Sequence, residues 1–143
     1  MAYYFGNHST KTLKTCHTDL QLIAKEALKW SPLDFKIVEG YRSIARQQAL
    51  YLEGKTKIDG INKLGKHNRN PSMAFDIVVN NKHTLTWKDT DMCFVAGVIL
   101  SVGARLFEEG KVTHKLRWGG NWDGDGIILS DQKFDDVPHF ELV

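Results

Sequence analysis

A single carboxylate interrupts the apolar stretch MAFDIVV at residues 73–79. Asp76 has apolar neighbours on both sides, as in a strand that is buried in a core. A buried carboxylate without partners is strongly destabilising. The fold must therefore give Asp76 either several backbone donors at the start of the strand or a cation. The residues around Asp76 leave both interpretations open.

Hydrophobic spacing divides the chain into helices and strands without an internal repeat or a linker-like segment. We expect helices at residues 18–29, 43–52 and 89–108, and strands at residues 35–40, 73–79, 116–120 and in the C-terminal HFELV. Because the helices and strands do not alternate strictly, the pattern favours an α+β fold with a small, mostly antiparallel sheet packed with helices. A length of 143 residues fits one domain, 1–143.

Local signals refine these boundaries. Ser43 is expected to cap the second helix, Asp89 or Thr90 the third, and Asn80–Asn81 to form a turn. The segment 55–71 is a long polar loop, and loops of this length inside a compact domain often carry function.

Composition excludes some classes of protein. Net charge is +2, hydrophobic residues make up 42%, and charged residues make up 25%, so nothing marks a dedicated nucleic-acid binder. The N-terminus lacks the apolar core of a secretory signal, and the apolar run FVAGVIL is too short to cross a bilayer. We therefore expect a protein of the cytoplasm without stable membrane insertion.

The C-terminal stretch DDVPHFELV changes the interpretation of Asp76. In an extended conformation His139 and Glu141 share one face, and Asp136 precedes His139 by three positions. Two histidines and one carboxylate are a common zinc ligand set with an open fourth position, and a nearby second carboxylate suits a general base. The alternative is a closing edge strand with a polar rim. Both remain open at this point.

These residues resemble a family of zinc peptidases that includes D-Ala-D-Ala carboxypeptidases and, more closely, phage endolysins that are L-alanyl-D-glutamate endopeptidases. The resemblance covers nearly the whole chain and is carried by four quoted segments: FGNHSTKTLKTCHTDLQLIAKEALKWSPLDFKIVEGYRS, HNRNPSMAFDI, LRWGGNWDGDG and HFELV. It implies a Hedgehog/DD-peptidase-like fold. It also implies zinc ligands His67, Asp76 and His139, a catalytic acid/base at Asp136, an arginine near the scissile carbonyl at Arg42, and a cleft-lining Gln47.

The chain departs from the family pattern Ser-x-His-x-x-Gly-x-Ala-x-Asp in one loop. Gly65 stands at the serine position, Ser72 at the glycine position, and two extra residues separate His67 from Asp76. We expect the extra residues to bulge away from the metal. Arg42 also has a second interpretation, an ordinary surface pair with Glu39.

The resemblance implies a phage endolysin that hydrolyses the L-Ala-D-Glu bond of the peptidoglycan stem and thereby lyses bacteria. We expect a monomer that binds neither nucleic acid nor membrane and that reaches the wall from the host cytoplasm on lysis. A D-Ala-D-Ala carboxypeptidase of the same family and a non-catalytic wall-binding module are the alternatives.

The loop NWDGDGIILSDQ (121–132) indicates a calcium site or a solvated acidic turn. Asn121, Asp123, Asp125 and Gly126 take positions 1, 3, 5 and 6 of an EF-hand-like loop, whereas position 12 is Gln132, beside Asp131. The histidines outside the zinc set, at positions 8, 17, 83 and 114, are expected to be surface residues. Trp118 and Trp122 belong either to the cleft or to the core.

Overall fold

The computed structural model describes residues 3–130 and 135–143. The helices are α1 (Asn7–Leu13), α2 (Thr18–Trp30), α3 (Ile44–Leu52), the short 3-10 helix η1 (Lys66–Asn68) and α4 (Asp89–Glu108). The strands are β1 (Asp34–Glu39), β2 (Ala74–Asn81), β3 (Thr84–Thr86), β4 (Leu116–Gly119) and β5 (Asp136–Leu142). The α+β class predicted from the sequence is confirmed.

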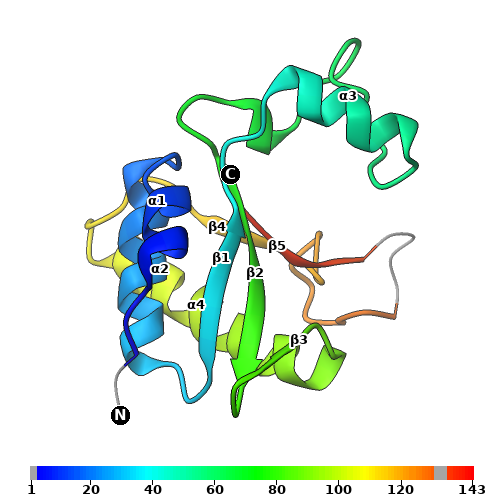
Figure 1. Cartoon of the computed structure of the whole chain (residues 1–143). Helices are drawn as coiled ribbons and strands as arrows, with labels where there is room; N and C mark the ends of the chain where they lie inside the picture. The colour runs from blue at the N-terminus through cyan, green and yellow to red at the C-terminus, as the bar shows by residue number, and fades with distance from the viewer. Residues whose placement is uncertain (1–2, 131–134) are drawn as a thin grey trace.

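The strands form one antiparallel sheet in the described part of the chain. Its order is β1-β2-β5-β4, and β3 also pairs with β2. Helices α1, α2 and α4 lie together beside the sheet, whereas α3 stands apart at the end of the strands, joined to the body by loops (Figure 1).

The core lies between the sheet and the α2–α4 pair. Helix α2 buries the apolar stripe predicted from its spacing: Leu20, Ile23, Ala24, Ala27 and Leu28. Helix α4 is long and apolar enough, by length and composition, to cross a membrane, with a mean hydropathy of 1.6. In this fold its buried residues, which include Val95 and Ile99, belong to the core cluster shared with the sheet. It therefore has the position of a core helix.

Two local predictions are wrong. Asn80 and Asn81 do not form the turn. Strand β2 continues through both residues. Their side-chain amides hold them there, because Asn80 Nδ2 donates to Asp34 at 3.1 Å and Asn81 Nδ2 donates to Asp91 at 3.2 Å. The turn lies at Lys82–His83, where both φ angles are positive (50° and 66°), as in two-residue hairpins.

The second wrong prediction concerns the start of the helix α4. Its N-cap residue is Lys88, without a side-chain cap, so Asp89 and Asp91 lie in the first turn instead. There their charges favour the helix N-terminus. The predicted cap at Ser43 is confirmed, since its hydroxyl accepts from the Arg46 amide at 3.1 Å.

Candidate metal centre and cleft

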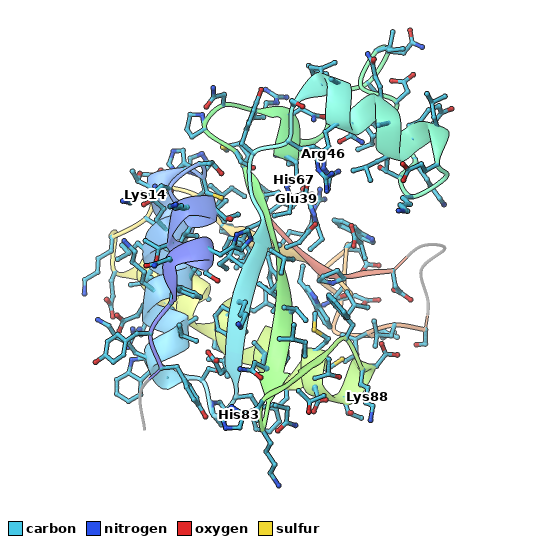
Figure 2. The ribbon with its side chains drawn as sticks, in the orientation of Figure 1. Lys14, Glu39, Arg46, His67, His83 and Lys88 are labelled. Carbon is cyan, nitrogen blue, oxygen red and sulfur yellow. The ribbon has the colours of Figure 1, made fainter. Side chains whose placement is uncertain are left out.

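Two histidines and one aspartate meet at the end of the sheet that faces α3. His67 Nε2 lies 3.2 Å from Asp76 Oδ1 and 3.1 Å from His139 Nδ1, and the latter two atoms are 3.2 Å apart. His67 and His139 are buried. Figure 2 labels His67 at this end of the sheet, beside Glu39 and Arg46. The three atoms thus form a nearly equilateral triangle.

The outer hydrogen bonds of both imidazoles determine which nitrogen carries the proton. His67 Nδ1 lies 2.8 Å from the Gly40 carbonyl, which can only accept, so Nδ1–H donates and Nε2 keeps a lone pair. His139 Nε2 lies 2.8 Å from Glu141 Oε1, a carboxylate, so Nε2–H donates and Nδ1 keeps a lone pair. When both imidazoles are neutral, three acceptors therefore converge on one point.

Electrostatics of the site agree with a bound cation. Burial alone would raise the pKa of Asp76, but the two histidines outweigh it and hold that pKa far below its usual range. Burial lowers the pKa of His139, but hydrogen bonds to Asp76 and Glu141 outweigh it and raise that pKa to about 9. Without a metal ion, His139 is therefore protonated at neutral pH, and its Nδ1–H donates to Asp76. A metal ion at this point would displace that proton and bind the three lone pairs of the neutral form.

Strand pairing brings these residues together. Asp76 and His139 are direct partners in the β2–β5 register, although 63 positions separate them in the sequence. His67 lies in η1. The chain then returns to the body of the protein, where Ser72 forms an isolated β-bridge with Cys16. Arg69, Asn70 and Pro71 are exposed between these anchors. The loop residues between these anchors thus lie on the surface, Arg69 lines the cleft, and both ligand candidates remain in place.

Asp136 lies beside the triangle as the first residue of β5. Its Oδ2 is 3.9 Å from His139 Nδ1. Burial raises the pKa of its carboxyl, and the negative charge of Asp76 raises it further. A Cβ atom on Gly119, its partner on β4, would overlap the Asp136 carbonyl, so a glycine is needed for this close approach of the two strands. A raised carboxyl pKa next to a cation site is typical of an acid/base group.

Arg42 combines the two interpretations made from the sequence. Its Nε donates to Glu39 at 2.8 Å, as in the surface-pair alternative, but the side chain is mostly buried, and Nη2 lies 3.8 Å from Asp76 Oδ2. Gln47 is buried; its Oε1 accepts from Arg42 Nη1 at 3.0 Å, and its Nε2 donates to the Ile58 carbonyl at 2.8 Å. Gln47 therefore holds Arg42 and ties the polar loop to α3.

Glu141 and Arg117 support His139 through hydrogen bonds on the side of its ring opposite the triangle. Glu141 Oε2 accepts from Arg117 Nη2 at 2.6 Å, and the guanidinium lies over the Trp122 ring at 5.4 Å from its centre. The Trp122 and His139 ring centres are 5.6 Å apart. Burial alone would raise the pKa of Glu141, but hydrogen bonds from His139 and Arg117 hold it at about 2. Glu141 therefore remains an acceptor.

The triangle borders one cleft of about 500 Å³, which Asp136, Arg42, Gln47 and the Glu141–Arg117 pair also line. Its walls come from the sheet end, with Asp76, Asp136 and His139, and from the polar loop after α3. Trp122 lines this cleft, whereas Trp118 is buried in the core.

Comparison with known proteins determines the family. Residues 1–143 match the family described as phage L-alanyl-D-glutamate peptidase. The chain belongs to this family. The L-alanyl-D-glutamate peptidase of Escherichia phage T5 is 30% identical over 147 residues, which cover 100% of both chains. This family membership confirms the resemblance noted from the sequence.

A solved relative has the same fold as this family member. The crystal structure of the L-Ala D-Glu endopeptidase ChiX from Serratia marcescens superimposes with a TM-score of 0.76 at 24% identity, over 97% of this chain and 89% of that one. At this identity the likeness concerns the fold. It agrees with the peptidase-like α+β architecture expected from the sequence.

Sequence reasoning missed a second histidine–aspartate group, at the start of α2. His17 and His114, predicted to be plain surface residues, join the buried Asp19, and one ligand atom of each lies within 4.8 Å of the others. His17 Nδ1, however, accepts from the Asp19 amide at 3.0 Å, so that nitrogen is occupied as a helix cap. Asp19 Oδ2 accepts from the Thr113 amide and from His114 Nδ1, at 2.9 and 2.7 Å. We therefore assign this group a structural role, because its hydrogen bonds join α2 to the loop after α4.

Asp19→Asn is expected to destabilise the fold by about 1–3 kcal/mol at pH 7. Burial alone would raise the pKa of Asp19, but hydrogen bonds from His114 and Thr113 outweigh it and hold that pKa below its usual value. A lowered pKa gives stability that is present above the unfolded-state value of about 3.9 and is lost as pH falls through the folded value. Urea unfolding should show that the loss of folding free energy caused by Asp19→Asn is smaller at pH 3.5 than at pH 7. Glu108→Gln, an exposed carboxylate on α4, is the control, and an equal penalty at both pH values would contradict this role.

The predicted calcium loop is only partly described, because Asp131 and Gln132 lie outside the described residues. The Asp123 and Asp125 side chains accept from the amides of Asp125 and Ile127, at 3.2 and 2.7 Å, as local turn caps. Within residues 3–130 and 135–143, the histidine, cysteine and carboxylate groups that could hold an ion lie elsewhere. Calcium binding at Asn121, Asp123, Asp125 and Asp131 stays a prediction.

Proposed function

We propose that this chain is a zinc-dependent endopeptidase that hydrolyses the L-Ala-D-Glu bond of the peptidoglycan stem. The observation that carries the proposal is the convergence of three lone pairs, on His67, Asp76 and His139, at one wall of an open cleft. The family is named for peptidases of this bond, and the phage T5 and ChiX relatives carry the same activity in their names.

The donor set fits zinc. Ligand atoms that bind one tetrahedral zinc at about 2.0–2.1 Å stand about 3.3 Å apart, and the three atoms here are 3.1–3.2 Å apart. Each imidazole donates its other N–H to an acceptor, Gly40 or Glu141, which is the usual outer support of zinc-binding histidines. When bound, zinc supplies Lewis-acid activation of water and of the substrate carbonyl.

The residues beside the triangle supply the proton transfers and the charge stabilisation. Asp136, with its raised pKa, accepts the proton of the attacking water and delivers it to the departing amine. Arg42, fixed by Glu39 and Gln47, presents its guanidinium to the carbonyl oxygen as negative charge develops there.

The test is mass spectrometry of purified peptidoglycan digested by the protein. Fragments with a new N-terminal D-Glu support the endopeptidase. Loss of the terminal D-Ala would instead assign a carboxypeptidase, and intact stems would leave a wall-binding module. We propose in addition that the protein acts as a monomer, without nucleic acid or membrane insertion, and that it reaches the wall from the host cytoplasm on lysis.

Glu141→Gln is expected to weaken zinc binding about 10- to 100-fold. Glu141 accepts from His139 Nε2 with one oxygen and from Arg117 with the other, whereas glutamine has a single, uncharged acceptor oxygen for these two donors, so the support that orients the imidazole is weakened. Zinc dissociation constants measured by competition with a chelator check this, independently of activity. Glu108→Gln is again the control, and unchanged zinc affinity in Glu141→Gln would contradict the positioning role.

A further inference from the structure

Positive charge gathers on one wall of the cleft. The segment 55–69, KTKIDGINKLGKHNR, has five basic residues and one acidic residue, a net charge of +4. The whole chain has 19 basic and 17 acidic residues, so the remainder has 14 and 16, a net charge of −2. This segment therefore accounts for the positive net charge of the protein, and all five of its cations line the cleft: Lys55, Lys57, Lys63, Lys66 and Arg69.

The acidic groups nearby do not neutralise this wall. Asp59 turns into its own loop, where it accepts from the amides of Ile61, Asn62 and Lys63 at 2.8–3.1 Å, and it does not line the cleft. The acidic residues that do line the cleft have other partners. Asp76 belongs to the histidine triangle, Asp136 lies 3.9 Å from His139 Nδ1, and Glu141 is paired with His139 and Arg117. These three carboxylates face seven cations of the lining, because Arg42 and Arg117 line the cleft as well. A ligand in the cleft therefore faces a net positive wall.

Three of these cations are close in sequence to His67 of the candidate metal centre. Lys66 precedes His67, and its Nζ donates to the Leu142 carbonyl at 2.8 Å, which fixes the ammonium at the sheet end. Lys63 and Arg69 flank this position and are exposed, so their charged groups can turn toward a ligand. We call Lys63, Lys66 and Arg69 the basic wall.

The chemistry of the proposed substrate matches such a wall. A D-Glu residue has two carboxyl groups, and only one is used when the stem continues. The other stays beside the scissile amide as a carboxylate, unless it is converted to an amide. An amide has nearly the same shape but no charge, so a basic wall distinguishes the two forms, while a merely shape-complementary cleft does not.

We propose that the basic wall recognises the free carboxylate of the D-Glu residue, so that the protein is selective for stems that are not amidated there. This inference rests on the proposed function. Lys and Arg side chains in partly exposed positions contribute modestly each, and together we expect an approximately tenfold preference in kcat/KM for the free acid over the amide. The preference should fall as salt is raised, because salt screens exposed charges.

The experiment compares two synthetic stem peptides that differ only in this group, carboxylate or carboxamide. Cleavage of each is measured, together with binding of their non-cleavable ketomethylene analogues. The variant replaces Lys63, Lys66 and Arg69 with Gln. The matched control replaces Lys11, Lys14 and Lys25 with Gln, three exposed lysines that lie in α1, just after α1 and in α2, outside the cleft lining. Figure 2 shows Lys14 at the end of α1, away from His67.

The native protein and the control variant should favour the free acid about tenfold, and the basic-wall variant should treat both peptides nearly alike while still cleaving the amide. Equal cleavage of both peptides by the native protein would overturn the inference and leave the proposed function intact. A preference that survives in the basic-wall variant would overturn it as well. Selective binding of the free-acid analogue without cleavage of either peptide would support the basic wall and refute the endopeptidase.

Discussion

Asp136→Asn is expected to lower kcat/KM for a stem peptide by about 10²- to 10⁴-fold while the zinc content stays at one equivalent. Asparagine has the size of aspartate but cannot accept the proton of the attacking water. Asp136 is also outside the hydrogen-bonded triangle, since its Oδ2 is 3.9 Å from His139 Nδ1. The change should therefore separate proton transfer from metal binding.

Peptide cleavage followed by chromatography, with metal analysis of the same samples, checks this. Asp135→Asn, at the exposed neighbouring residue, is the matched control and should leave both quantities unchanged. Activity of Asp136→Asn within about tenfold of the native protein would contradict the acid/base role. Zinc loss in this variant would show that Asp136 acts on the metal instead.

His67→Ala and His139→Ala should each lose the zinc and lower activity by about 10³-fold or more. Either substitution opens the triangle and leaves only one imidazole and one carboxylate, too few ligands for a structured zinc site. Zinc content after dialysis and kcat/KM should fall together. Circular dichroism should remain native at 25 °C, because the core between the sheet and the α2–α4 pair is untouched.

The second histidine–aspartate group supplies a matched control for this experiment. His17→Ala and His114→Ala remove the same residue type from a group of the same composition, but one whose atoms are engaged in protein hydrogen bonds. Both should keep one equivalent of zinc and near-native activity, with a lower melting temperature. Zinc loss from these variants, or its retention in His67→Ala, would mean that the ligand assignment is wrong.

Two residues of the candidate metal centre, Asp76 and His139, stand out from their local sequence, whereas His67 was assigned only through the family resemblance. Asp76 is a charge in an apolar strand, and His139 follows a proline with an acidic residue three positions earlier. Strand pairing brings the two together, since the antiparallel β2–β5 register that pairs Phe75 with Phe140 also places Asp76 opposite His139. Gly119, at the close approach of β4 to Asp136, has no such local signature, because its role depends on a strand that is paired from elsewhere in the chain.

Other features depend on contacts between distant segments and could not be inferred locally. Asp19 meets His114 across 95 positions, so neither histidine of that group had a telling neighbour in the sequence. The two asparagines at 80 and 81 have a high intrinsic turn tendency, but their amides bond to Asp34 and Asp91 and keep them in β2. In both cases tertiary hydrogen bonds outweigh local preference.

The proposed zinc site requires one ion at the meeting point of His67, Asp76 and His139. An anomalous difference map at the zinc absorption edge, from crystals of the protein as purified, tests it most directly. We predict one strong peak at about 2.0–2.2 Å from His67 Nε2, Asp76 Oδ1 and His139 Nδ1. A peak at His17, Asp19 and His114 instead, or no peak in a preparation that cleaves peptidoglycan, would contradict the account.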